Sequence, residues 1–223
     1  MENFTIHTMD DLMRAVETYG YLPFFKNAIA GFSVKEHVDP ALWFTDQPGP
    51  WEWKGPVIRT LGCAYGKFFE KKAAFVSREW FADFANYRRG GYDMDALYDE
   101  GLARHGDKTI FDIIEQHGPV LSKNARRIGN YGKDGASGFD AAMTRLQSMC
   151  YVLTSDFVYS KDRWGRQYGW GVAQYATPEQ FMGADFTDRV YRREPEQSRQ
   201  LLLAHLRKLF PETPEKTLVK FLG

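Results

Sequence analysis

The chain has 223 residues, of which 43% are hydrophobic and 26% are charged, the proportions of a soluble globular protein with a sizeable core. Lysine plus arginine and aspartate plus glutamate both total 29, so no overall charge drives the whole surface onto nucleic acid or a membrane. No apolar run is long enough to cross a bilayer, the polar start MENFTIHTMDDL is unlike a secretory signal, and two cysteines, Cys63 and Cys150, suit a cytoplasmic protein with free thiols and no zinc site.

The first half of the chain predicts a helix, a proline-rich loop and a hairpin. Thr8 caps a helix over residues 9–19. Residues 30–57 are predicted to be a loop, because four prolines alternate there with aromatic residues. The runs AYGKFF and KAAFVS predict two strands around Glu70–Lys71. Further helices are expected over two ranges, Ser77–Tyr87 and Asp95–Arg104.

The next stretch predicts three short helices. The first ends near Gly118, Ser122 caps the second, and Ser137 followed by Asp140 resembles a capping box for the third. Apolar residues recur at helical spacing in the third helix and predict its buried face, which comprises Phe139, Met143, Leu146 and Cys150. Its opposite face is predicted to carry Ala141, Thr144, Arg145 and Ser148.

The stretch DFVYSKDRWGRQYGWGVAQYAT, residues 156–177, predicts a second hairpin. Apolar and polar residues alternate on both sides of a short loop that contains a glycine. The tip carries three cations and a tryptophan: Lys161, Arg163, Arg166 and Trp164. Three helices followed by a hairpin is the order of a winged-helix module, so the predicted fold is α+β and mostly helical.

This order favours a role for the hairpin in DNA binding. In helix-turn-helix proteins the last helix enters the major groove, where an arginine reads base edges. A cationic tip contacts the adjacent phosphates, and an aromatic ring wedges between bases or stacks on them. The predicted DNA-binding residues are Arg126, Arg127, Thr144, Arg145, Ser148, Lys161, Arg163, Trp164 and Arg166. Two other interpretations stay open, a solvated charged turn and a module that contacts proteins.

Three regions are predicted along the chain. Residues 1–105 form an aromatic-rich α/β part whose pattern also permits a degenerate winged helix, and residues 106–183 form the winged-helix module. Residues 184–223 supply packing helices. A helix over 195–210 places leucines on one face, which suits packing and also pairing of two copies of the chain.

Several segments carry a family resemblance: AYGKFFEKKAAFVSREWFADFANYRR at 64–89, AAMTRLQSMCYV, DFVYSKDRWGRQ and YGWGVAQYATP. They resemble the winged-helix family of the AlkZ-type DNA glycosylases over residues 60–180. The chain is more similar still to the AlkZ-related proteins of bacteria, over nearly its full length. The resemblance implies a winged-helix fold, DNA as a partner and a link to base repair.

The chain departs from the glycosylases at their catalytic motif. Those enzymes carry a Gln-apolar-Gln or Gln-apolar-Asp tripeptide that handles water or the sugar, and no glutamine of this chain begins one. The glycosylases also tend to have a Trp-x-His where Lys71 stands here. The usual catalytic groups are therefore missing or replaced.

Base excision needs a carboxylate or another polar group that orients water, and a slot in which a base can stack. The candidate catalytic residues are Glu52, Glu70 and Lys71, and the candidate pocket residues are Trp43, Trp51, Trp53, Tyr65 and Lys67. The alternative is that the tryptophans pack the core and the lysines are surface charges. The histidines lack the spacing of metal ligands, so no metal and no cofactor is expected.

The sequence thus predicts a cytoplasmic winged-helix protein that binds double-stranded DNA and not a membrane. Whether it is an enzyme stays open. One alternative is an active glycosylase that cleaves the N-glycosidic bonds of damaged bases. The other is a non-catalytic protein-interaction or regulatory module.

Overall fold

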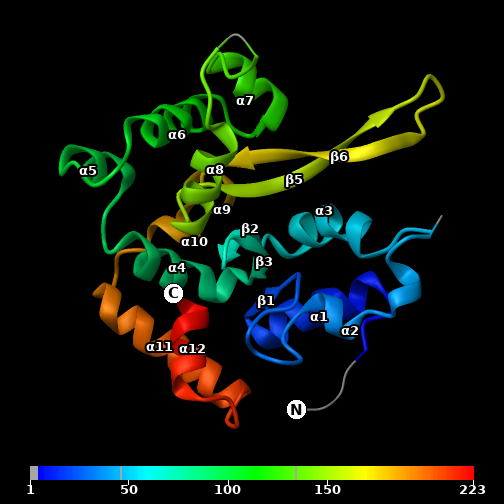
Figure 1. Ribbon diagram of the computed structural model, residues 1–223, viewed down its shortest axis with the longest axis vertical. Helices are drawn as coiled ribbons and strands as arrows, with labels where there is room; N and C mark the ends of the chain where they lie inside the picture. The colour runs from blue at the N-terminus through cyan, green and yellow to red at the C-terminus, as the bar shows by residue number, and fades with distance from the viewer. Residues whose placement is uncertain (1–4, 46, 134) are drawn as a thin grey trace.

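The computed structural model describes residues 5–45, 47–133 and 135–223 and shows an α+β fold, as the sequence predicts (Figure 1). The first part contains α1 (Met9–Tyr19), β1 (Tyr21–Pro23), α2 (Val34–His37), the short 3-10 helix η1 (Pro40–Leu42), α3 (Pro50–Leu61), β2 (Ala64–Phe69), β3 (Lys72–Val76), α4 (Arg78–Arg89) and α5 (Met94–Asp99). The middle part contains α6 (His105–His117), β4 (Val120–Leu121), α7 (Ser122–Ile128), α8 (Phe139–Ser148), β5 (Leu153–Lys161) and β6 (Gln167–Ala176). The chain ends with α9 (Pro178–Met182), α10 (Ala184–Thr187), α11 (Pro195–Leu209) and α12 (Glu215–Leu222).

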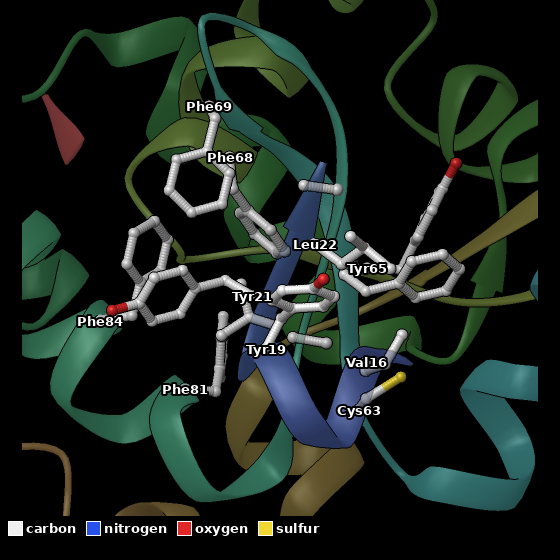
Figure 2. Close-up of a cluster of buried hydrophobic side chains, with 14 of the residues drawn as sticks. Val16, Tyr19, Tyr21, Leu22, Cys63, Tyr65, Phe68, Phe69, Phe81 and Phe84 are labelled. Carbon is white, nitrogen blue, oxygen red and sulfur yellow. The ribbon is translucent and has the colours of Figure 1, made fainter. Parts of the chain in front are cut away.

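The first sheet is antiparallel with strand order β1-β3-β2 and includes the predicted hairpin around Glu70–Lys71. Its core is rich in aromatic rings. Figure 2 shows Tyr21, Phe69 and Phe84 gathered from β1, β2 and α4, and ring centroids 6.1 Å (Tyr21–Phe69) and 5.1 Å (Phe69–Phe84) apart place them in contact. Phe221 of α12 stacks on Phe69 at 4.5 Å, so the last helix of the chain completes the core begun by the first strands.

The helix cap predicted at Thr8 is confirmed, and a second threonine caps a later helix in the same way. The Thr8 hydroxyl accepts a bond from the Asp11 amide at the start of α1, and Thr177 does the same for Gln180 at the start of α9. The predicted helix at the C-terminal end is α11, which packs along α4 with Leu202 and Leu206 buried. The leucine face is therefore used inside the molecule, and Leu201 stands among the exposed residues of this helix.

The loop prediction for residues 30–57 is wrong in part, because the short helices α2 and η1 lie within it and α3 begins at Pro50. Proline fits the first turn of a helix, where its missing N–H needs no partner, and the Glu52 carboxylate accepts the Gly49 amide at 2.9 Å. Pro56 lies inside the helix, which costs a hydrogen bond. Burial of Trp53, Val57 and Ile58 offsets that cost. The helix expected over Asp95–Arg104 is shorter, as α5 ends at Asp99 before Gly101 in the left-handed region.

The second sheet is antiparallel with order β4-β6-β5; α6 and α7 pack against it, and α8 packs on α6 and on β2 of the first sheet. The three helices and the hairpin predicted here are confirmed, as is the burial of Phe139, Met143 and Leu146 on one face of α8. Cys150, predicted on the same face, follows the end of α8 and is buried in the first core instead. The predicted caps are wrong. The cap of α7 is Leu121 and that of α8 is Gly138 in the left-handed region at φ 87°, so neither serine caps a helix.

Only the inner half of the β5–β6 hairpin, where β5 begins and β6 ends, packs against the rest of the molecule. Near Leu153 and Ala176 the strands lie in the core, and β5 packs against both α3 and β2. The other half extends away from the body of the molecule (Figure 1). The fold thus presents the charged tip at the end of a projecting arm.

Candidate functional site

A single carboxylate organises the tip of the hairpin. Asp162 accepts hydrogen bonds from the backbone amides of Trp164 at 2.8 Å and Arg166 at 2.9 Å, and from Nε of Arg166 at 2.9 Å. The partial burial of the carboxylate opposes ionisation, but the bonds from Arg166 and Trp164 lower the pKa of Asp162 below its ordinary value. Gly165 has φ 82°, a left-handed conformation that closes the turn. The tip is therefore an ordered turn.

Two of the three cations of the tip lie over its tryptophan ring. The guanidinium of Arg163 lies 3.9 Å and that of Arg166 4.8 Å from the Trp164 ring centroid. Lys161 lies exposed beside them at the end of β5. One of the three cations pairs with Asp162, so the tip keeps a net positive charge. A cationic, partly aromatic tip of this kind suits phosphate groups.

The foot of the hairpin is fixed to α3 and β2. The Phe157 ring lies 5.7 Å from that of Tyr65, and Arg59 of α3 forms an ion pair with Asp156. Gly171 permits a close approach, because a Cβ there would lie 2.9 Å from the Tyr159 ring. This packing sets the direction in which the arm leaves the body.

A hollow of about 440 Å³ lies between α3 and the hairpin foot. It is lined by Met9, Pro48, Glu52, Trp53, Pro56, Arg59, Phe157, Tyr159 and Gln167. One oxygen of Glu52 holds the Gly49 amide, and burial together with the charges of Glu52 and Asp156 raises the pKa of Tyr159. The hollow thus brings a carboxylate, a phenol and an amide together beside aromatic surface.

Three of the predicted pocket residues form one aromatic cluster around Phe24. Its ring lies 5.5 Å from Trp43, 5.4 Å from Trp51 and 6.3 Å from Tyr65. Trp43 and Tyr65 are buried and Trp51 is partly buried, so these rings pack the interior, whereas Trp53 lines the hollow.

Lys54 is a feature that sequence reasoning missed. Its ammonium lies 4.3 Å from the Phe157 centroid, 4.8 Å from Trp51 and 5.8 Å from Phe24. Burial lowers the pKa of Lys54 to about 8, with the Glu52 carboxylate opposing the shift, and the ring faces attract the remaining charge. A lysine beside two tryptophans was the available signal, but only the fold brings Phe24 and Phe157 to it.

Two other predicted residues, Glu70 and Lys71, lie apart from this hollow. They form the turn between β2 and β3, both exposed and both with positive φ, at 48° and 60°. Glu70 pairs with Lys72 at 3.0 Å. Of the three catalytic candidates, Glu52 is the one that the fold places beside the hairpin.

The predicted base-reading face of α8 contacts the rest of the protein. The Thr144 hydroxyl accepts from Nζ of Lys67 at 3.0 Å, and the Ser148 hydroxyl donates to the Lys67 carbonyl at 2.9 Å. The Arg145 guanidinium makes two hydrogen bonds to Asp107 of α6, at 2.8 and 2.5 Å. These partners lie within the chain, so a base would have to compete with them.

A second cationic surface lies at the end of α7. A hollow of about 530 Å³ there is lined by Lys123, Arg126, Arg127, Asn130, Tyr131, Gly132, Lys133 and Gly135. Arg126 pairs with Asp140 at 2.5 Å and lies 4.3 Å from the Phe139 ring centroid. Arg127 is exposed. This surface and the hairpin tip hold five of the nine side chains predicted to bind DNA, with Lys161 at the base of the tip as a sixth.

Two further observations concern ligands and membranes. In the part of the chain that the structure describes, no group of three histidine, cysteine or carboxylate side chains lies close enough to hold a metal ion. None of the helices within residues 5–45, 47–133 and 135–223 is long and apolar enough to cross a membrane.

A family model described as AlkZ related matches residues 6–223 of the chain. Neither a curated protein nor a solved structure matches it.

Proposed function

Because the chain belongs to the AlkZ-related family, we propose that it is a winged-helix protein that binds double-stranded DNA through its hairpin, in a role linked to DNA base repair. The family itself suggests a relation to DNA-repair glycosylases. The observation that carries the proposal is the projecting tip, where Arg163 and Arg166 lie over the Trp164 ring and Lys161 is exposed at the end of β5.

The order of elements supports the winged-helix assignment. Helix α6, strand β4, helices α7 and α8 and the β5–β6 hairpin follow one another, and β4 pairs with β6. In this arrangement α8 is the recognition helix and the hairpin is the wing. The internal contacts of Thr144, Arg145 and Ser148 favour a mode in which the wing and the cationic end of α7 carry the binding.

If the protein binds phosphates, the salt dependence of its affinity reports the number of phosphate contacts. Each phosphate contact releases a condensed counterion. The negative slope of log affinity against log salt therefore becomes shallower by roughly 0.9 for each cation removed. Replacing Lys161, Arg163 and Arg166 together by alanine is expected to weaken binding to every sequence alike, because phosphate contacts do not read bases.

Fluorescence-anisotropy titrations with labelled duplex DNA at several salt concentrations measure both effects. The matched control is alanine at three exposed lysines elsewhere, Lys35, Lys208 and Lys216. If the hairpin variant keeps the affinity and slope of the unaltered protein, or if both triple variants lose affinity equally, the hairpin is not the binding element.

The hollow beside Glu52 favours a second candidate function, N-glycosidic cleavage of damaged bases. A glycosylase needs a group that orients water near the sugar, and Glu52 is a carboxylate in a hollow that also presents Tyr159 and Gln167.

Release of free base from duplexes that carry alkylated purines tests the second candidate. Glu52→Gln retains an oxygen for the Gly49 amide and removes the carboxylate, so release is expected to slow by a factor of about 100 or more. Glu70→Gln, in the exposed β2–β3 turn, is the matched control. No release of base from a broad panel of lesions would leave DNA binding without catalysis.

A further inference from the structure

The outer half of the hairpin exposes three aromatic side chains. Trp164 is 64%, Tyr168 59% and Trp170 78% exposed. Residues 167–170 of β6 are exposed without interruption, and in Figure 1 this end of the hairpin stands clear of the helices. Grouped aromatic surface of this kind is uncommon on soluble proteins unless it binds something. Hydrogen bonds to phosphates would use only the Tyr168 hydroxyl and the Trp170 indole N–H, so phosphate binding does not account for the exposed ring faces of these two residues.

The charge around the rings indicates the chemistry of the occupant. Lys161, Arg163 and Arg166 outnumber Asp162, so the aromatic surface lies in a positive field. A positive surface with interleaved rings binds nucleic acid whose bases are unstacked, since the cations hold the backbone while the bases stack on the rings. Guanidinium planes such as those over Trp164 stack on bases as well.

The backbone of β6 adds room for bases beside the rings. Gly169, between Tyr168 and Trp170, has φ 74°, and the pairing of β5 with β6 shifts register between Val158 and Ser160. Such an irregularity bends a strand and redirects its side chains. A Cβ built on Gly169 would meet no neighbour within 4 Å, so the space next to it is open.

We infer that Tyr168 and Trp170, together with Trp164, form a stacking surface for unpaired DNA bases, so that the hairpin binds single-stranded or locally melted DNA in preference to intact duplex. This inference rests on the proposed DNA binding and names its substrate class. In an intact duplex the base faces are covered by their neighbours, so the rings have no face to stack on and the duplex offers only phosphates and base edges.

Anisotropy titrations with three labelled DNAs of one length test the inference: a single strand, a duplex with a central unpaired bubble, and a fully paired duplex. The single strand and the bubble are expected to bind at least 10-fold more tightly than the paired duplex. Trp170→Ala and Tyr168→Ala are each expected to weaken binding of the unpaired DNAs by roughly 5- to 150-fold, the range supplied by stacking one base, and to change paired-duplex binding little.

The matched control is Tyr92→Ala, an exposed ring in the segment between α4 and α5. Quenching of tryptophan fluorescence at saturating unpaired DNA, reduced in Trp170→Ala, gives a second readout that does not depend on affinity. Equal affinity for all three DNAs, with the salt slope of the hairpin cations retained, would overturn the stacking surface and leave the proposed function standing. No binding to any of the three would overturn both.

Discussion

Arg89 shows how much one buried side chain holds together in this protein. Its Nη1 donates to Glu179 at 2.7 Å and to the Tyr191 hydroxyl at 2.9 Å, and Nη2 donates to the Cys150 carbonyl at 2.8 Å. The guanidinium therefore joins α4 to α9 and to the turn that follows α8. The Cys150 backbone has φ 62°, and this bond helps to hold that conformation.

Replacing Arg89 by methionine is expected to lower the free energy of unfolding by about 3 kcal/mol. This is the low end for breaking a buried ion pair, because the Glu179 carboxylate still reaches water while the Cys150 carbonyl loses its donor. Arg192→Met, at an exposed position, is expected to change stability by less than about 0.5 kcal/mol. Urea denaturation followed by circular dichroism measures both, and equal effects would contradict the assigned role.

The role of Arg89 was out of reach of sequence reasoning for a physical reason. Two arginines at the C-terminal end of a helix are expected to lie at the surface, where their charges interact favourably with the helix dipole. The partners of Arg89 lie 61 to 102 positions away along the chain, and no local pattern points to them. The hairpin tip was predictable because its turn, charges and ring lie within a few residues of one another.

At the scale of elements, α8 has one face in a core and another against β2. Leu146 is buried in the second core, whereas Thr144 is partly exposed and touches Lys67.

Leu146→Ala is expected to lower the free energy of unfolding by about 2–5 kcal/mol through the lost burial and the cavity left behind. Thr144→Ala is expected to be close to neutral, because alanine favours the helix and offsets one exposed hydrogen bond. Thermal denaturation of the two variants compares them, and similar shifts would mean that the helix phase is wrong.

The periodicity of α8 was enough to predict its buried face, but the docking of its other face was not predictable. An isolated winged-helix pattern leaves that face to solvent, so small polar residues with an arginine indicate base reading. In this protein Gln147 is buried and accepts the Lys67 amide at 2.9 Å. A contact across 80 positions leaves no periodic trace in the sequence. Helix α3 was missed for the opposite reason. Its prolines are a strong local signal for a loop, but the burial of its apolar side chains against distant parts of the chain stabilises a helix there.

Across the whole molecule, two hydrophobic cores share a wide junction. One core joins the first sheet to the C-terminal helices, and the other lies among α5 to α8. Cys150 belongs to the first core and the adjacent Tyr151 to the second. The contacts of α8 with β2 and of β5 with α3 and β2 extend this junction.

Because the cores are joined through side chains of both, they are expected to unfold together. Differential scanning calorimetry is expected to give one transition whose calorimetric enthalpy equals its van 't Hoff enthalpy. Two resolved transitions, or a calorimetric enthalpy well above the van 't Hoff value, would show that the cores unfold separately. Gln147→Ala, at the junction, is expected to widen the transition more than Thr144→Ala does.

The length of the projecting hairpin determines how far its tip stands from the body of the molecule. Phe157 is packed against Tyr65 and Lys54 at the foot, and the turn begins five positions later at Asp162. At about 3.3 Å per residue the tip stands roughly 16 Å beyond that anchor. The major groove of B-DNA is about 8.5 Å deep and the minor groove about 7.5 Å. The arm is thus longer than either groove is deep, so a tip on a body that rested on the phosphate backbone could reach the floor of a groove.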